Sequence, residues 1–151
     1  MEIYGVSLIG HRRIEEFPRL QDRLLELVLR LLREKEYVEF YIGRDGDFDI
    51  LAAAVIKQAQ KMFGSHNSSL ILVLPYPKKD EAYYRVYYDD VWRPLSSTTH
   101  FKAVITKRNQ WMIEQSKLLI ACVRHPHGGA YNALQYAEKR EVPIVNLATI
   151  E

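Results

Sequence analysis

Residue types that bind phosphorylated ligands occur in four short segments of the 151-residue chain. Glycine lets a ligand approach the backbone closely, and arginine can bind a phosphate or a carboxylate through two parallel hydrogen bonds. The segments are GHRR at 10–13, GRDGDFD at 43–49, PYP at 75–77 and HPHGG at 125–129. Each one follows a run of apolar residues, which suggests that all four occupy equivalent positions in the fold.

The last segment has the form of a phosphate-binding turn, because Gly128 and Gly129 stand directly before a predicted helix. A helix N-terminus offers backbone N–H groups and the positive end of the helix dipole, and both favour a phosphate. Arg12 would add a full positive charge. A tight turn without a ligand explains each segment about equally well on its own, but four such segments together favour a ligand site.

Alternating strands and helices must position these segments. Runs of β-branched, aromatic and other apolar residues predict strands at 2–9, 37–42, 70–74, 118–123 and 142–147. Apolar residues at helical spacing, with capping residues, predict helices at 18–35, 49–64, 100–115 and 129–140. In the second of these helices the expected apolar side consists of Ile50, Leu51, Ala54, Val55 and Met62.

This alternation predicts an α/β fold in one domain spanning 1–151, with helices on both faces of a mostly parallel five-stranded sheet. The strands at 70–74 and 118–123 are apolar throughout, which is typical of strands buried on both faces. In this fold the four segments at 10–13, 43–49, 75–77 and 125–129 follow the carboxyl ends of strands, where ligands bind in open α/β sheets.

The composition, 48% hydrophobic and 26% charged, excludes a largely disordered chain. With 21 Lys and Arg against 19 Asp and Glu, the charge of +2 gives no argument for nucleic acid or membrane. The single cysteine, Cys122, excludes an internal disulfide and is expected to be a buried small hydrophobe. Without a run of about 20 apolar residues or a signal-peptide pattern, a cytoplasmic location is expected.

Several acidic and hydroxyl residues can be explained by a structural role, such as helix capping, as well as by ligand binding. Asp49 is predicted to be the N-cap of the second helix, and it could also bind a ribose hydroxyl. Asp45 and Asp47 are expected to be loop acids rather than metal ligands. The residues at 97–99 (Ser-Thr-Thr) resemble a cap for the helix at 100–115.

Arg108 and Asn109 lie inside a predicted helix, where asparagine is a mediocre helix former. They could contact a ligand or a second subunit. The alternative is a solvated helix face, with Trp111 and Met112 packing inward.

The histidines of the first and last segments also have two interpretations. His125 and His127 would need further ligands to bind a metal, so no metal site is predicted and the loop is expected to border the ligand pocket. His11 could be structural or could touch the ligand.

The chain resembles the YpsA-like branch of the SLOG superfamily, whose members are related to the Lonely Guy phosphoribohydrolases and to the DNA-processing protein DprA. The resemblance covers nearly the whole chain and rests on GHRR at 10–13, GRDGDFD at 43–49, LVLPYP at 72–77, KRNQWM at 107–112 and GGAYNALQYA at 128–137. It implies a Rossmann-like three-layer domain with a nucleotide or nucleotide-derivative pocket at the strand ends.

The chain departs from the phosphoribohydrolase motif Pro-Gly-Gly-x-Gly-Thr-x-x-Glu. Aligned on Gly128 and Gly129, it carries His127 for the proline, Tyr131 for the third glycine, Asn132 for the threonine and Gln135 for the glutamate. Glutamine cannot act as a general base or stabilise an oxocarbenium ion by its charge. The departure argues against that hydrolase chemistry.

The segment 76–92 holds five tyrosines and Trp92 outside the simple strand–helix order. Its rings could stack on a base, form a subunit interface or cover the sheet edge. The irregular stretch from there to His100 is long enough to favour a lid or an interface loop.

The sequence therefore predicts a nucleotide-binding protein, either a sensor or an enzyme of undefined reaction, that forms homo-oligomers and has no identified cofactor. An active nucleotide N-glycosidase and a DprA-like protein that binds single-stranded nucleic acid are the alternatives; the latter would use a basic stripe of Lys78, Lys79, Lys102, Lys107 and Arg108. The candidate ligand-binding residues are Gly10, His11, Arg12, Gly43, Gly46, Asp49, Pro75, Arg108, Asn109, Gly128, Gly129 and Asn132.

Overall fold

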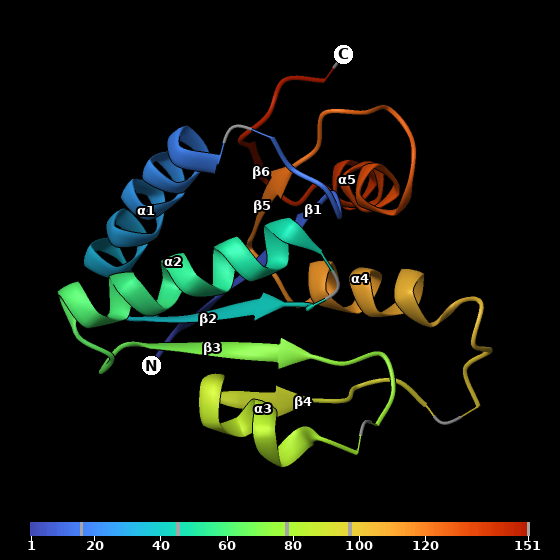
Figure 1. Cartoon of the computed structure of the whole chain (residues 1–151), viewed down its shortest axis with the longest axis horizontal. Coiled ribbons are helices and arrows are strands. Elements are labelled where there is room, and N and C mark those ends of the chain that lie inside the picture. The colour runs from blue at the N-terminus through green and yellow to red at the C-terminus, as the bar shows by residue number, and fades with distance from the viewer. Residues whose placement is uncertain (16, 45, 78, 97, 151) are drawn as a thin grey trace.

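A computed structural model describes residues 1–15, 17–44, 46–77, 79–96 and 98–150. The elements follow in the order β1 (Ile3–Gly10), α1 (Phe17–Glu34), β2 (Tyr37–Ile42), α2 (Asp47–Phe63), β3 (Ser68–Val73), α3 (Glu81–Tyr87), β4 (Asp90–Trp92), α4 (Val104–Glu114), β5 (Leu118–Cys122), α5 (Gly129–Lys139) and β6 (Ile144–Asn146) (Figure 1). Among these residues no helix is both long and apolar enough to cross a membrane.

The described strands form one six-stranded sheet in the order β4-β3-β2-β1-β5-β6, and every pairing is parallel. The predicted α/β sandwich is confirmed, but the prediction of five strands is wrong. The sixth strand is the three-residue β4, which pairs with β3 at the sheet edge. Its brevity and the preceding helix α3 hid it inside the tyrosine-rich segment, which was predicted to be irregular.

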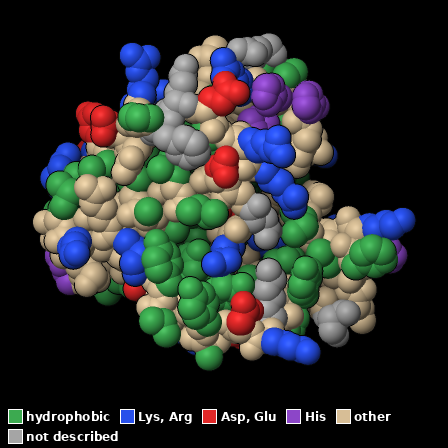
Figure 2. Space-filling model, viewed as in Figure 1, with side chains coloured by type: hydrophobic (Ala, Val, Ile, Leu, Met, Phe, Trp, Pro, Cys, Tyr) green, Lys and Arg blue, Asp and Glu red, His purple; other side chains and the backbone are tan. Residues whose placement is uncertain are grey.

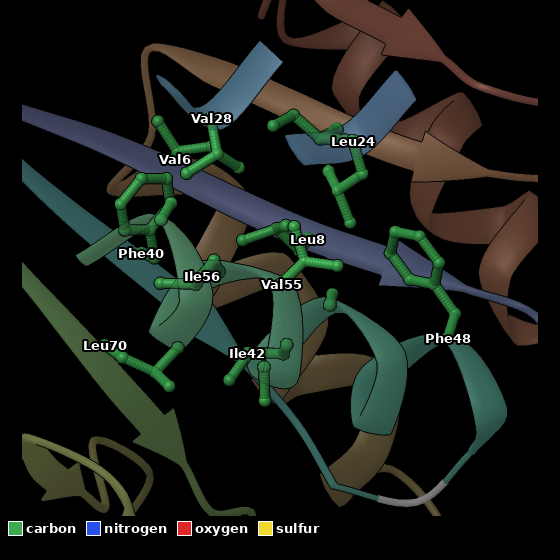
Figure 3. Close-up of a cluster of buried hydrophobic side chains, with 14 of the residues drawn as sticks. Val6, Leu8, Leu24, Val28, Phe40, Ile42, Phe48, Val55, Ile56 and Leu70 are labelled. Atoms are coloured by element: carbon green, nitrogen blue, oxygen red, sulfur yellow. The ribbon is translucent and has the colours of Figure 1, made fainter. Parts of the chain in front are cut away.

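Helices cover both faces of the sheet and enclose two hydrophobic clusters. On one face α1 and α2 pack together over β1, β2 and β3, with Leu8, Phe48 and Ile56 among the fully buried side chains (Figure 3). On the other face α4 and α5 pack over β1 and β5, around Met112 and Leu119. Cys122 is buried, as predicted.

The apolar side of α2 differs from the predicted one at Ile50, Ala54 and Met62, which are all exposed. Ile50 and Met62 are each 61% exposed, whereas Phe48, Ala52, Ala53, Val55, Ile56 and Ala59 face the core. Five of these residues are alanine, valine or isoleucine, which let the helix approach the sheet closely, so burial follows their spacing rather than the size of the side chains. Gly64 ends the helix with φ of +110°, as predicted.

Helix α4 begins later than predicted. Its N-cap is Ala103, and Thr98 and Thr99 lie in the turns before it. Ser97, the first residue of the predicted cap, falls outside the described residues. The interpretation of 97–99 as a helix cap is therefore wrong for the two threonines, because turns at 101–103 separate them from the helix.

Candidate functional site

A cavity of about 290 Å³ lies at the carboxyl ends of β1, β2 and β5. The chain runs outward from β1 through β2 and β3 to β4, and then returns to place β5 on the opposite side of β1. The crevice between β1 and β5 is therefore the topological switch point of the sheet, where open α/β folds bind ligands. The four predicted segments were expected at this edge.

Most of the predicted ligand-binding residues line this cavity. The residues brought together are Gly10, His11, Arg12, Gly43, Gly46, Asp49, Arg108, Asn109, Gly128 and Gly129. Two are not among its described lining residues. Pro75 is buried just beyond β3, and Asn132 points to a neighbouring cavity.

The N-terminus of α5 opens directly into the cavity. Gly128 is the N-cap and has φ of +94°, a conformation that side-chain-bearing residues rarely adopt. A Cβ atom added to Gly128 or Gly129 would meet no heavy atom within 4 Å. The start of the helix therefore borders open space in the cavity, and its first backbone N–H groups, which lack partners within the helix, suit an anion there.

The loops after β1 and β2 are joined to each other below this opening. The amide of Asp47 donates to the carbonyl of Arg12 at 2.8 Å, and a carboxylate oxygen of Asp47 accepts from the amide of Ile14 at 3.1 Å. A Cβ on Gly46 would lie 2.6 Å from the Cα of Arg12, so this crossing requires glycine. The contacts hold exposed Arg12 at the rim of the cavity.

The predicted N-cap role of Asp49 is wrong. Gly46 is the N-cap of α2 and Asp47 is the first helical residue, so Asp49 stands within the first turn. Its carboxylate still benefits from the positive end of the helix dipole. That turn borders the cavity, and Asp49 is one of the residues that line it, as predicted. Asp45 falls outside the described residues.

Gly10 serves packing as well as the cavity. A Cβ at this position would stand 2.5 Å from the ring of Phe48, whose side chain is fully buried. Any other residue would push Phe48 out of its place at the start of α2 (Figure 3). The glycine at the end of β1 thus positions α2 against the sheet.

Arg108 forms part of the cavity floor and not of a solvated surface. Its side chain is buried, with Nη1 donating to the carbonyl of Val73 at 3.1 Å and Nε donating to Oδ1 of Asn109 at 3.0 Å. Gly43 leaves room for the guanidinium. Both the solvated-face interpretation of Arg108 and its place in the predicted basic stripe are therefore wrong, and Lys78 lies outside the described residues.

His11 organises the loop that follows β5. Its Nε2 accepts hydrogen bonds from the amides of Arg124 and His125, each at 3.0 Å. Burial, with added repulsion from His125 and His127, lowers the pKa of His11 below its ordinary value. His11 is therefore neutral at pH 7, with its proton on Nδ1. Among the described residues no group of three His, Cys, Asp or Glu side chains has the arrangement of a metal site.

A second cavity of about 210 Å³ lies between α4 and α5 and shares Asn109 and Gly129 with the first. Asn132 and Gln135 line it, and Nε2 of Gln135 donates to the hydroxyl of Tyr131 at 3.3 Å. Its described lining includes no carboxylate. The position of the phosphoribohydrolase glutamate thus faces a space lined by several amides and by Lys139.

Sequence reasoning missed the apolar wall of the main cavity, which Ile105 and Met112 of α4 provide. The signal was present in the sequence. Positions 105, 108, 109 and 112 follow the spacing of one helix face, so Arg108 and Asn109 belong to the same side as Met112.

No protein-family model matches the chain, and no curated protein matches it either. Solved structures of low sequence identity do share its fold. DNA processing protein A from Helicobacter pylori, described for its mode of binding single-stranded DNA, has a TM-score of 0.62 at 17% identity, covering 93% of this chain and 63% of that one. Its counterpart from Streptococcus pneumoniae has a TM-score of 0.54 at 14% identity, covering 95% and 59%.

The molybdenum cofactor carrier protein from Chlamydomonas reinhardtii also matches, with a TM-score of 0.61 at 16% identity, covering 96% of this chain and 76% of that one. The chain spans about 60% of the length of the two DNA processing proteins. Identities this low establish the fold alone. They confirm the Rossmann-like three-layer fold expected from the sequence, whereas the SLOG superfamily and its YpsA-like branch stay predictions.

Proposed function

We propose that this SLOG-type chain binds a nucleotide or nucleotide derivative in the cavity between β1 and β5, with a phosphate at the N-terminus of α5. The observation that carries the proposal is the open space in front of Gly128 and Gly129 at the switch point of the sheet. A bare helix N-terminus there supplies both hydrogen-bond donors and favourable potential for an anion.

The other lining residues supply complementary chemistry. Arg12 at the rim and Arg108 in the floor bring positive charge to the same cavity. Asp49 can accept hydrogen bonds from ribose hydroxyls, and Ile105 with Met112 forms an apolar wall suited to a base. A volume of about 290 Å³ stands at the small end of ligand pockets, which favours a ligand no larger than one nucleotide.

The fold neighbours support a ligand-binding role, since one is named for carrying a cofactor and the other for binding single-stranded DNA. The DNA-binding neighbour keeps nucleic acid as a second candidate. The burial of Arg108 weakens the surface stripe proposed for that role. An N-glycosidase is less favoured, because Gln135 replaces the glutamate and faces the second cavity. The proposal includes a single domain that acts as a homo-oligomer. It covers both a ligand sensor and an enzyme of undefined reaction.

A thermal-shift screen of nucleoside mono-, di- and triphosphates, each beside its unphosphorylated nucleoside, tests the proposal. A ligand at 100 times its Kd adds about 2.7 kcal/mol. At roughly 2.1 cal/mol/K per residue this raises the Tm of a 151-residue chain by about 8 °C. We expect a phosphate-dependent shift that Arg12→Ala reduces. Equal shifts with nucleosides, or none with any nucleotide, would contradict the proposed site.

A further inference from the structure

A third cavity lies between α2 and α3, away from the candidate nucleotide site. Its volume is about 280 Å³, and its lining is dominated by Tyr83, Tyr84, Tyr87 and Tyr88, with Ile50 at its edge. An apolar cavity of about 150 Å³ is large enough to hold benzene. The cavity therefore has ample room for one large aromatic side chain.

Exposed apolar side chains extend this cavity into a surface patch, which we define as Ile50, Tyr83, Val86 and Tyr87. Tyr83 is 68% exposed and Val86 is 85% exposed. Figure 2 shows hydrophobic side chains gathered over α2 and α3 on this face, with both basic and acidic side chains at the margin. Grouped apolar exposure of this kind is typical of interaction sites.

The exposed rings of the patch are held in place before any partner arrives. Tyr83 packs edge-on against buried Tyr84, with ring centroids 5.9 Å apart, and Tyr87 packs edge-on against buried Tyr88 at 5.0 Å. Edge-to-face pairs of this kind are favourable in themselves. Because the rings are already ordered, a partner would pay little conformational entropy to bind them.

The charges beside the patch are positive. The guanidinium of Arg44 lies 4.7 Å from the centre of the Tyr84 ring, and Nζ of Lys57 lies 4.4 Å from that of Tyr87. Burial raises the pKa of Tyr88 to about 12, so its phenol does not neutralise Arg44 at pH 7. Among the nearby acids, Glu81 pairs with Arg93 and Asp90 pairs with Arg85. Asp49 is a further acid close to Tyr88, so Arg44 and Lys57 together leave a net positive charge beside the patch.

From these observations we infer that the patch docks a segment of a partner protein that inserts one large apolar side chain into the α2–α3 cavity and places an acidic residue against Arg44 or Lys57. Tyrosine and arginine around a side-chain-sized pocket are characteristic of the residues that dominate protein–protein binding energy.

Two other occupants fit the charges or the composition less well. A second copy of this chain, related by two-fold symmetry, would place the same patch on both sides of one interface and gather Arg44 and Lys57 of both copies there, an excess of like charge. Surfaces that bind nucleic acid are polar and strongly positive. This patch instead exposes the aliphatic side chains of Ile50 and Val86.

Selection of a displayed random-peptide library on the full chain tests the inference. We expect the enriched peptides to combine an aromatic or large aliphatic residue with an acidic neighbour. Ile50→Lys should weaken their binding at least tenfold, and Arg44→Glu should do the same. The matched controls are Met62→Lys and Lys61→Glu. Met62 lies on the same helix and is 61% exposed, as Ile50 is, but it does not line the cavity.

Three results would overturn the inference. The first is a library that yields no enrichment, or peptides that bind the Ile50→Lys variant as well as the wild type. The second is an oligothymidylate that binds the wild type and loses that binding in Ile50→Lys, which would assign the patch to nucleic acid. The third is a fall in sedimentation mass caused by Ile50→Lys alone, which would assign it to self-association. None of these readouts depends on nucleotide binding.

Discussion

The guanidinium of Arg108 lies directly beside Gly43, and a methyl group at position 43 would stand 2.8 Å from its Nη1. Gly43 directly follows the strand β2, while Arg108 comes from the middle of α4. The glycine is needed there because a buried arginine occupies the space that a side chain would take. The pair joins the central sheet to α4 beneath the candidate nucleotide site.

Gly43→Ala is expected to displace Arg108 and to lower the free energy of unfolding by about 1–3 kcal/mol, the usual cost of overpacking. In an Arg108→Ala background the added methyl should cost much less, because the clash is gone. Urea denaturation of the two single variants and the double variant measures this coupling. Additive effects would show that the two residues do not share this space.

Gly10→Ala tests whether the glycine at the end of β1 serves packing. The methyl group would stand 2.5 Å from the buried ring of Phe48, and we expect a loss of about 1–3 kcal/mol. Adding Phe48→Leu should recover part of that loss by removing ring atoms. Thermal unfolding of the single and double variants is sufficient. A fully stable Gly10→Ala protein would refute the contact.

His11 should make stability fall as the pH is lowered. Its pKa is below the ordinary value of about 6.5 in the folded protein, so between the two values the unfolded chain binds a proton that the folded chain does not. The unfolding free energy should therefore decrease as the pH drops below about 6.5 and level off below the folded pKa. An NMR titration of the His11 ring gives the folded pKa directly, and a value above 6.5 would contradict the hydrogen bonds to its Nε2.

Two isoleucines on α2 provide a matched pair for the orientation of that helix. Ile56 is fully buried, whereas Ile50 is 61% exposed. Ile56→Val should cost about 0.5–1.5 kcal/mol, and Ile50→Val should cost almost nothing. Chemical denaturation measures both. Equal costs would mean that the apolar side predicted from the sequence, which included Ile50, is the correct one.

The sequence predicted the sheet edge well, because glycine and charged residues that follow apolar strands are a local signal. Gly43 and Gly128 could be placed from their neighbours alone. The sixth strand could not, since Asp90–Trp92 is too short for a period of two to be recognised. Its place in the sheet depends on pairing with β3, a contact between distant parts of the chain.

The burial of Arg108 was equally hidden from local reasoning. An arginine is normally exposed, and it is buried here because Val73, Asn109 and Gly43 supply partners and space from three separate segments. Asn132 was predicted to line the main cavity and is not among its described lining residues. It lies one turn beyond Gly129, and that turn carries it to the second cavity.

The most direct test of the account is calorimetric binding of the nucleotide that gives the largest thermal shift, to wild type, Gly129→Ala and Asn132→Ala. A methyl at Gly129 would fill the open space in front of α5 without touching the protein, so it should weaken binding tenfold or more, with the unfolding free energy unchanged or higher. Asn132→Ala should change affinity little. Unaltered affinity in Gly129→Ala, or a greater loss in Asn132→Ala, would contradict a phosphate site at this helix.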